Sequence, residues 1–280
     1  MHANTKTTRL NYTPILTFFT LTYYSSISKC IQVDVYCQND IKKFVNLNKI
    51  INATLPPEAA YFVGYANLAN LLPEKYHGLD YAVVIGRRLD DRIIDAIIDG
   101  PNIEYYAHYN DVNLELAKVG HDLADTIRQQ GSKAFVIEPT IQDKDLDNNF
   151  IKTLRFDFSH KMAATRAGLG WIGKTALFIS KQYGPRVRLV TVLTDYPIPY
   201  CTEPINDSQC GSCDLCVRHC PAQAANGKLW NIDVDRNDFF DPFACRNKAR
   251  ELSLRNFGKH ASICGKCIVV CPIGKSNRKE

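Results

Sequence analysis

Hydrophobic residues between positions 33 and 200 alternate between the spacing of buried strands and that of amphipathic helices. Short apolar runs rich in β-branched residues predict strands at residues 81–86, 134–137 and 187–194. Apolar residues at helical spacing predict a short helix at residues 90–98 and a longer one from Asp111 to the residue before Gly131. Because strands and helices interleave, we expect a mixed α/β or α+β sheet domain.

Three further segments place the remaining elements of this domain. Residues 142–149 are rich in Asp and Asn and predict a polar loop. Residues 159–167 contain several alanines and predict a helix. Prolines at positions 197 and 199 close the last strand, so we expect the domain to end near residue 200.

The first 32 residues form an N-terminal extension. Residues 10–28 carry no charge, which is the outline of a signal peptide, but Pro14 and many Thr and Ser residues interrupt them and no small-residue cleavage pattern follows. The segment is also too polar for a membrane span. We interpret it as an accessory extension, with export as the alternative, and we interpret Cys30 and Cys37 as ordinary buried thiols.

The composition is that of an ordinary globular protein, with 45% hydrophobic and 22% charged residues. A chain of 280 residues has room for one sizeable core and a small appended module. The net charge of +5 is mild, and no dense Lys/Arg block occurs outside the short C-terminal tail. Charge therefore favours neither a nucleic acid nor an acidic protein as partner.

Eight cysteines between residues 210 and 271 follow the spacing of a ferredoxin that carries two iron-sulfur clusters. They are Cys210, Cys213, Cys216 and Cys220, followed by a proline, then Cys245, and then Cys264, Cys267 and Cys271, again followed by a proline. The second motif has Ala261 where a ligand is due, so the lone Cys245 completes the set of eight. In such proteins the cysteine before the proline serves the other cluster.

We therefore expect two 4Fe-4S clusters with crossed ligands. The first set is Cys210, Cys213, Cys216 and Cys271, and the second set is Cys220, Cys245, Cys264 and Cys267. A structural zinc ribbon is the alternative, although zinc would leave several thiols unused. A disulfide framework is a further alternative that suits small secreted domains better than a chain of this length. Thiols that must stay reduced predict a reducing compartment, the cytoplasm.

Residues 168–174 form a glycine-rich loop around a tryptophan. The letters match a dinucleotide fingerprint, but they follow a predicted helix rather than a strand and lack the Walker arrangement, which disfavours NAD and ATP. Three glycines at this spacing indicate backbone that approaches a flat ligand, or alternatively a tight packing turn. The candidate cofactor-binding residues are Gly168, Gly170, Trp171, Gly173 and Lys174.

Asp157, His160 and Lys161 form a candidate proton-donor group, with Asp157 and His160 as the catalytic candidates. An aspartate among aromatic residues can have a raised pKa, and a histidine titrates near neutral pH without tuning of its pKa. The alternative is a helix N-terminus capped by Ser159 or Asp157. His108, among three tyrosines, is either the wall of a flat-ligand pocket or an ordinary histidine.

Residues 166–174, residues 194–197 and the cysteine motifs together resemble the epoxyqueuosine reductase family, over about residues 81–272. That family is similar to corrinoid-dependent reductive dehalogenases. The resemblance implies an α+β fold with a nitroreductase-like, cobalamin-holding domain at residues 33–200 and a ferredoxin-like dicluster domain at residues 201–280. A reduced ferredoxin or flavodoxin would supply electrons through the clusters to the corrinoid, which acts on a small or nucleoside-like substrate.

The chain departs from the family pattern in two places. The family's Asp-Ser-x-Pro stretch, whose aspartate is assigned as proton donor, is replaced by residues 156–161, and Asp157 is out of register with that aspartate. The chain ends eight residues after Pro272, without the helical repeat extension that is a candidate tRNA-binding element, so tRNA is a possible partner that charge does not support. A non-catalytic ferredoxin-like electron-transfer protein is the alternative function. The weak charge excess disfavours a zinc-dependent nucleic-acid binder.

Overall fold

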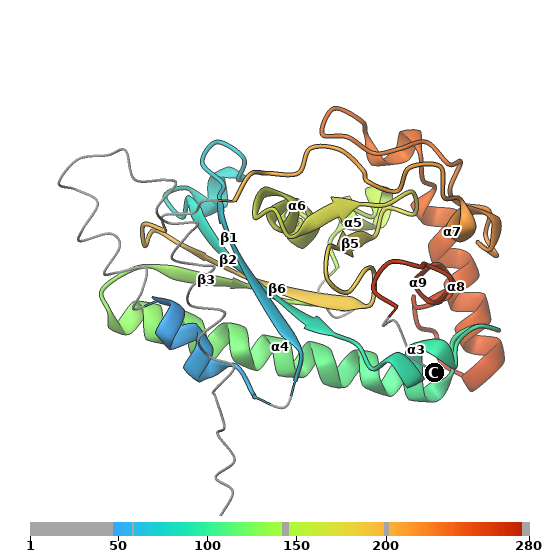
Figure 1. The fold of residues 1–280 in the computed structure, drawn as a ribbon, viewed down its shortest axis with the longest axis horizontal. Coiled ribbons are helices and arrows are strands. Elements are labelled where there is room, and N and C mark those ends of the chain that lie inside the picture. Colours follow the sequence, from blue (N-terminus) through green and yellow to red (C-terminus); the bar gives the residue numbers. More distant parts are fainter. Residues whose placement is uncertain (1–46, 58, 142–145, 199–201, 276–280) are drawn as a thin grey trace, which may run out of the picture.

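A four-stranded antiparallel sheet forms the centre of the molecule (Figure 1). The computed structural model describes residues 47–57, 59–141, 146–198 and 202–275. The strands are β1 (Tyr61–Asn67), β2 (Tyr81–Arg88), β6 (Val187–Thr194) and β3 (Ala134–Ile137), in this spatial order. The N-terminal extension at residues 1–32, with Cys30 and Cys37 near it, lies outside the described residues.

Helices cover both faces of this sheet. The long helix α4 (Ile103–Gln129) runs along one face, where Leu116, Val119 and Leu123 pack with strand residues such as Val190 and Val192. Helix α6 (His160–Arg166) covers the other face through its buried alanines, which pack with Ala82 and Val84 of β2. No described helix is both long and apolar enough to cross a membrane.

Most of the predicted helices and strands are present, but several begin or end at other residues than predicted. The strands predicted at 134–137 and 187–194 match β3 and β6, and β2 runs two residues beyond the predicted strand. Helix α4 begins at Ile103 rather than Asp111, because the side chain of Asn102 accepts a hydrogen bond from the backbone N–H of Tyr105 at 2.8 Å and caps the helix there.

Two further predictions need correction in length. The helix predicted at residues 90–98 is confined to α3 (Asp91–Asp95). The polar loop predicted at residues 142–149 lies partly outside the described residues, and its last two residues begin α5 (Asn148–Thr153), which Asp147 caps. Strand β1, the helical residues 47–54 and the short η1 (Glu74–Tyr76) are not predicted from the sequence pattern.

The C-terminal module consists of loops joined by short helices. Its elements are α7 (Leu215–Arg218), η3 (Arg236–Asp238), α8 (Pro242–Phe257) and α9 (Lys266–Val269). Ile263 and Val269 of this module belong to the same buried core as β2 and β6, and α9 contacts α3. The sheet domain and the module therefore share one core on this side of the sheet.

A small hairpin joins the two parts on the other side. Strand β4 (Gly170–Ile172) pairs antiparallel with β5 (Phe178–Ser180). Trp171 and Ile179 of the hairpin pack with Ile205 and Cys210 of the following segment. The glycine-rich loop of the sequence is thus the first strand and the start of the turn of this hairpin.

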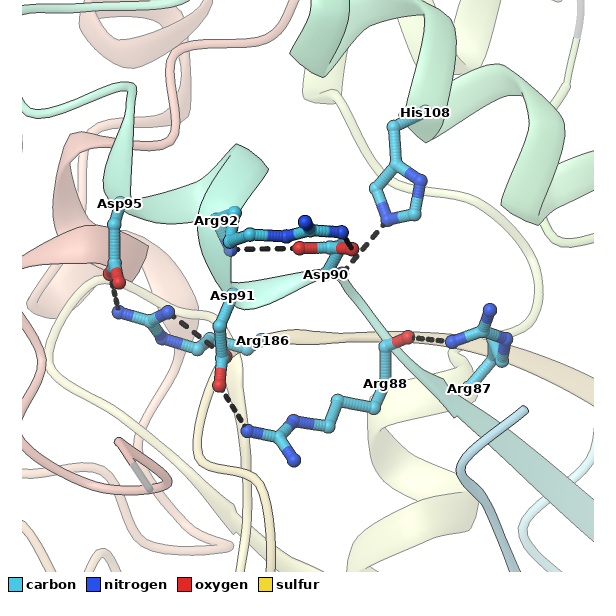
Figure 2. A network of polar contacts seen from close by, with 8 residues as sticks. All are labelled: Arg87, Arg88, Asp90, Asp91, Arg92, Asp95, His108 and Arg186. Atoms are coloured by element: carbon cyan, nitrogen blue, oxygen red, sulfur yellow. Dashed lines mark hydrogen bonds and ion pairs between the residues drawn. The ribbon is translucent and has the colours of Figure 1, made fainter. Parts of the chain in front are cut away.

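A buried arginine fixes the start of β6 to α3 (Figure 2). The side chain of Arg186 is 1% exposed, and its Nη1 and Nη2 donate to Oδ1 of Asp91 at 3.0 Å and of Asp95 at 2.7 Å. Arg88 of β2 also pairs with Asp91. The network therefore ties two strands to one helix through one fully buried cation, whose partners Asp91 and Asp95 are 20% and 42% exposed.

We predict that Arg186→Met lowers the free energy of unfolding by about 3 kcal/mol, because it leaves two carboxylates without their buried cation. Arg92 is the matched control, since its side chain is 88% exposed and pairs with Asp90 at the surface. Arg92→Ala should change stability by less than ~1 kcal/mol. Urea unfolding of the iron-loaded proteins under argon measures both, and equal midpoints for the two variants would contradict the prediction.

Candidate functional site

Eight of the nine cysteines in residues 201–280 lie in the described part of the chain, and they gather into two sets. The neighbours of Cys216 are Cys210, Cys271 and Cys213, and together with burial they raise the pKa of Cys216 to about 11. Burial raises the pKa of Cys245 to about 12, with Cys220 and Cys264 as its neighbouring thiols. Cys267, whose pKa burial also raises, has Cys245 and Cys264 as its nearest thiols. Most of these neighbours belong to one expected ligand set, although Cys216 of the first set also acts on Cys267, and the assignment of each cysteine to a cluster stays a prediction.

The chemistry of both sets fits a polynuclear metal group. Thiolates bind metals, and burial, together with the neighbouring thiols, favours the neutral form of Cys216, Cys245 and Cys267 until a cation compensates their charge. The second set lines a cavity of about 230 Å³ together with Lys161, Thr175 and Arg236. Within the described residues no three Cys, His, Asp or Glu side chains close on a point as they do around a single metal ion. The cavity and the number of thiols suit a cluster.

The glycine-rich loop packs against the protein itself. A Cβ added at Gly170 would lie 2.0 Å from the carbonyl oxygen of Ile179, and one added at Gly173 would lie 2.9 Å from the Ile179 side chain. Gly168 has a φ of +66° and faces Thr202. The close approach that these glycines allow is therefore made to the chain's own residues, which supports a packing turn. A contact of the loop with a flat ligand stays a prediction.

The two side chains of this loop point to the first cysteine set. The indole N–H of Trp171 donates to Sγ of Cys210 at 3.4 Å, and Nζ of Lys174 donates to the carbonyl oxygen of Cys213 at 2.9 Å. Both side chains are buried. The loop thus supports the cysteines of the first set.

Two cavities of similar size open beside the cysteines. The first, of about 630 Å³, has an apolar wall from β5 and β6, including Phe178 and Leu189. The second, of about 640 Å³, is lined by Phe150, Phe156 and Cys245 among others. The two cavities share the residues 154–156, Phe158 and His160, so this segment separates them.

The predicted catalytic residues lie at this boundary, where both ring nitrogens of His160 have hydrogen-bond partners. Its Nδ1 lies 2.8 Å from the hydroxyl of Thr191 and its Nε2 lies 3.0 Å from the carbonyl oxygen of Glu138. Since a carbonyl only accepts, Nε2 carries the ring hydrogen and Nδ1 accepts from the hydroxyl. Burial lowers the pKa of His160 to about 4, so the ring is neutral at pH 7 and its one N–H is committed.

Asp157 and Ser159 have the positions of surface and cap residues. Asp157 lines the second cavity, where it pairs with Nζ of Lys75 at 2.5 Å, and its side chain is 49% exposed. The hydroxyl of Ser159 accepts from the backbone N–H of Met162 at 3.3 Å, which confirms the helix cap. A catalytic role for Asp157 stays a prediction.

His108 is a structural residue rather than a pocket wall. Its Nε2 accepts from the backbone N–H of Asp90 at 3.0 Å, within the network of Figure 2, and it lines neither of the two cavities. Burial lowers the pKa of His108, in keeping with a neutral acceptor. His108 and Tyr109 share one sequence signal, which is their position in an aromatic-rich segment. This signal does not predict that Tyr109 lines the cavities whereas His108 does not.

Tyr109 and Arg188 form a pair that the sequence did not reveal. Both line the two cavities, and Cζ of Arg188 lies 4.4 Å from the centre of the Tyr109 ring. The charge of Arg188 lowers the pKa of Tyr109, against the effect of burial, and hydrogen bonds with Thr140 and Asn113 lower it further. An arginine inside the otherwise apolar strand β6 is the one sequence signal for this pair.

Lys161 lies on the wall between the first cavity and the second cysteine set. It lines both, and its Nζ donates to the carbonyl oxygen of Ala176 at 2.8 Å. Burial lowers its pKa to about 8, and the charges of Arg236 and Arg155 contribute. At pH 7 the ammonium is therefore mostly charged, which places a cation between the thiols and the cavity.

Comparison with known proteins first defines the class of the C-terminal module. Residues 209–274 match the family described as 4Fe-4S double cluster binding domain. The chain is therefore an iron-sulfur protein in this part, as its cysteine spacing predicts.

The wider chain resembles the epoxyqueuosine reductases. It is 35% identical over 129 residues to that of Listeria monocytogenes, which covers 43% of this chain and 31% of the relative. It is 29% identical over 160 residues to that of Aliivibrio fischeri, covering 56% and 37%. The tetrachloroethene reductive dehalogenase of Sulfurospirillum multivorans is 28% identical over 125 residues, covering 41% and 23%. The chain thus spans well under half the length of these curated relatives.

Solved structures show the same fold. A reductive dehalogenase studied for B12-dependent dehalogenation superimposes with a TM-score of 0.56 at 20% identity, covering 77% of this chain and 30% of that one. An epoxyqueuosine reductase bound to a modified tRNA-Tyr stem loop superimposes with a TM-score of 0.51 at 17% identity, covering 83% and 65%. At these identities the likeness establishes the fold.

We predict that Cys245→Ala removes one of the two clusters. Iron content after anaerobic reconstitution should fall from about eight to about four per chain, because this residue completes the second set. Cys37→Ala, at a cysteine outside both sets, is the control and should keep the full content. Iron analysis and paramagnetic resonance of the reduced proteins measure the loss, and two intact cluster signals in the Cys245 variant would refute the ligand assignment.

Proposed function

We propose that the chain is an iron-sulfur oxidoreductase in which two 4Fe-4S clusters pass electrons to a corrinoid in the first cavity, for reductive cleavage of a small or nucleoside-like substrate. One observation carries this proposal. Lys161, Ala176, Leu177 and Arg236 line both the first cavity and the cavity of the second cysteine set. One layer of residues therefore separates a cluster from a cavity large enough for a bound molecule.

The first cavity offers a suitable surface to a flat cofactor. Its apolar wall comes from β5, β6 and the hairpin turn, and Trp230 adds an aromatic side chain. When bound, a corrinoid supplies a cobalt centre that takes up electrons and breaks a bond of the substrate. The dehalogenase relatives support the corrinoid, and with it a nitroreductase-like sheet domain at residues 33–200 and a ferredoxin-like module at residues 201–280.

The Tyr109–Arg188 pair provides the proton that reductive cleavage needs. Replacement of a halide by hydrogen takes two electrons and one proton, and removal of an epoxide oxygen as water takes two electrons and two protons. Arg188 stabilises the phenolate of Tyr109, so the phenol gives up its proton more readily. Because Tyr109 lines both cavities, it faces the cofactor side and the second cavity, which we assign to the substrate.

The epoxyqueuosine reductase relatives support a nucleoside-like substrate, and one of their solved structures holds a tRNA stem loop. We accordingly infer that a nucleoside, free or within tRNA, is one substrate class to test. A reduced ferredoxin or flavodoxin is the proposed electron donor. Cluster thiolates require a reducing compartment, which supports the cytoplasm.

Anaerobic reconstitution with iron, sulfide and cobalamin tests the function directly. We expect a brown protein with about eight irons per chain that retains cobalamin through gel filtration. Addition of dithionite should then reduce the bound cobalamin, seen as a change in its absorption spectrum. An iron-loaded protein that leaves cobalamin free indicates a non-catalytic electron carrier, and a colourless zinc protein would overturn the proposal altogether.

We predict that Tyr109→Phe lowers turnover by about 100-fold or more, because the variant lacks the acidic proton. The reduction of bound cobalamin by dithionite should be unchanged, since it needs no proton from this residue. Turnover of epoxyqueuosine nucleoside, 3-bromo-4-hydroxybenzoic acid and tetrachloroethene identifies a substrate for the assay. In the parent protein the rate should fall as pH rises, with the midpoint below the ordinary pKa of tyrosine.

Tyr106→Phe is the control for this variant. Tyr106 lies on the same helix and packs against Phe257, with ring centres 5.6 Å apart, and it lines neither of the two cavities. Its replacement should leave turnover within about twofold of the parent. Equal turnover of the Tyr109 variant and this control would exclude Tyr109 as the proton donor.

A further inference from the structure

The turn between β4 and β5 inserts between the two cysteine sets. The backbone N–H of Gly173 donates to Leu177 O at 2.8 Å, and that of Ala176 donates to Gly173 O at 2.9 Å, which closes the turn. Its central side chains, Lys174 and Thr175, are each only 6% exposed although both are polar. Two buried polar side chains at one turn need partners, and both find them at the cysteines.

On one side the hairpin contacts the first set. Trp171, which is 5% exposed, donates its indole N–H to Sγ of Cys210 at 3.4 Å. The ammonium of Lys174 donates to the carbonyl oxygen of Cys213 at 2.9 Å and so lies beside the loop that carries three of the four ligands. A neutral donor and a cation thus approach the same cysteine set.

On the other side the hairpin contacts the second set. The side chain of Thr175 forms a hydrogen bond with the thiol of Cys267 and lines the cavity of about 230 Å³. Lys161 fixes the next residue of the turn, because its Nζ donates to the carbonyl oxygen of Ala176. Lys161 thereby anchors the backbone next to Thr175.

Donors that point at cluster sulfurs change the reduction potential. Reduction adds one electron to a 4Fe-4S cluster, and a hydrogen bond or a nearby positive charge stabilises the more negative state. Loss of such a donor therefore shifts the potential of its own cluster to more negative values. A donor on one side of the hairpin should have little effect on the cluster on the other side.

We propose that the β4–β5 hairpin is a tuning element that raises the reduction potential of each cluster through a separate donor, Trp171 for the first cluster and Thr175 for the second. Lys174 adds its charge to the first cluster. These are positioning residues, and the inference rests on the proposed function only through the ligand sets. Trp171 and Lys174 are predicted from the sequence to contact a flat cofactor. Here their side chains are assigned to the clusters instead.

Redox titration of two variants tests this proposal without substrate or corrinoid. Iron-loaded Trp171→Phe and Thr175→Val are titrated with dithionite under argon and followed by paramagnetic resonance, and the Cys245→Ala protein identifies the signal of the first cluster. Trp171→Phe should shift only the first midpoint potential to more negative values. Thr175→Val should shift only the second midpoint in the same direction.

Matched controls separate tuning from general loosening of the structure. Ile205→Val trims another buried side chain of the same small core, and this side chain carries no hydrogen-bond donor. Thr165→Val changes a buried threonine whose hydroxyl donates to the Met162 carbonyl oxygen at 2.8 Å. Both controls should keep the two midpoints of the parent.

If Trp171→Phe and Thr175→Val keep their full iron content and the midpoint potentials of the parent, the inference is overturned. It is also overturned if both midpoint potentials shift together in either variant. If Trp171→Phe fails to retain iron, Lys174→Gln decides for the first cluster, with Lys174→Arg as the charge-keeping control. A more negative first midpoint in Lys174→Gln alone supports the proposal, and an unchanged one overturns it. A parent protein that binds no iron overturns the proposed function itself.

Discussion

The burial of clustered thiols that must ionise to hold a metal is the constraint on which the rest of the structure depends. Iron binds thiolates, yet burial raises the pKa of Cys216 to about 11 and that of Cys245 to about 12. In the absence of compensating charge these thiols stay protonated. The thiolate form must therefore be stabilised by the surrounding protein or by the bound metal. Three cations lie near the cysteines: Lys174 of the hairpin beside the first set, and Lys161 of the sheet domain and Arg236 of the module itself around the second.

This constraint explains why the two parts of the chain share a core. A cysteine module by itself offers few apolar residues, and its loops have little regular structure. Ile263 and Val269 are buried against the sheet domain, and the hairpin reaches back into the module from the other side. The same contacts that stabilise the module bring the second cysteine set to the wall of the first cavity. In the proposed function, stability and electron delivery therefore depend on one interface.

The sequence predicts those features that local chemistry decides. The cysteine spacing predicts the 4Fe-4S double cluster domain that residues 209–274 match, and alternating, β-branched residues predict the central strand β6. The start of α4 was missed because it depends on the cap at Asn102 rather than on an apolar stripe. The behaviour of His160 and Tyr109 could not be predicted at all, since Thr191 and Arg188, which decide it, come from a distant strand.

The glycine-rich loop shows the limit of motif interpretation most clearly. A glycine indicates only that another group approaches the backbone closely at that position. A pyrophosphate, a flat cofactor and a neighbouring strand all require the same absence of a side chain. Here the neighbour is the carbonyl oxygen of Ile179, within the hairpin itself. Close pairing of β4 with β5 leaves the turn no freedom to relax, and a rigid turn can hold Trp171 and Thr175 toward different clusters at the same time. The glycines thus serve the clusters indirectly, because they fix the backbone that carries the donors.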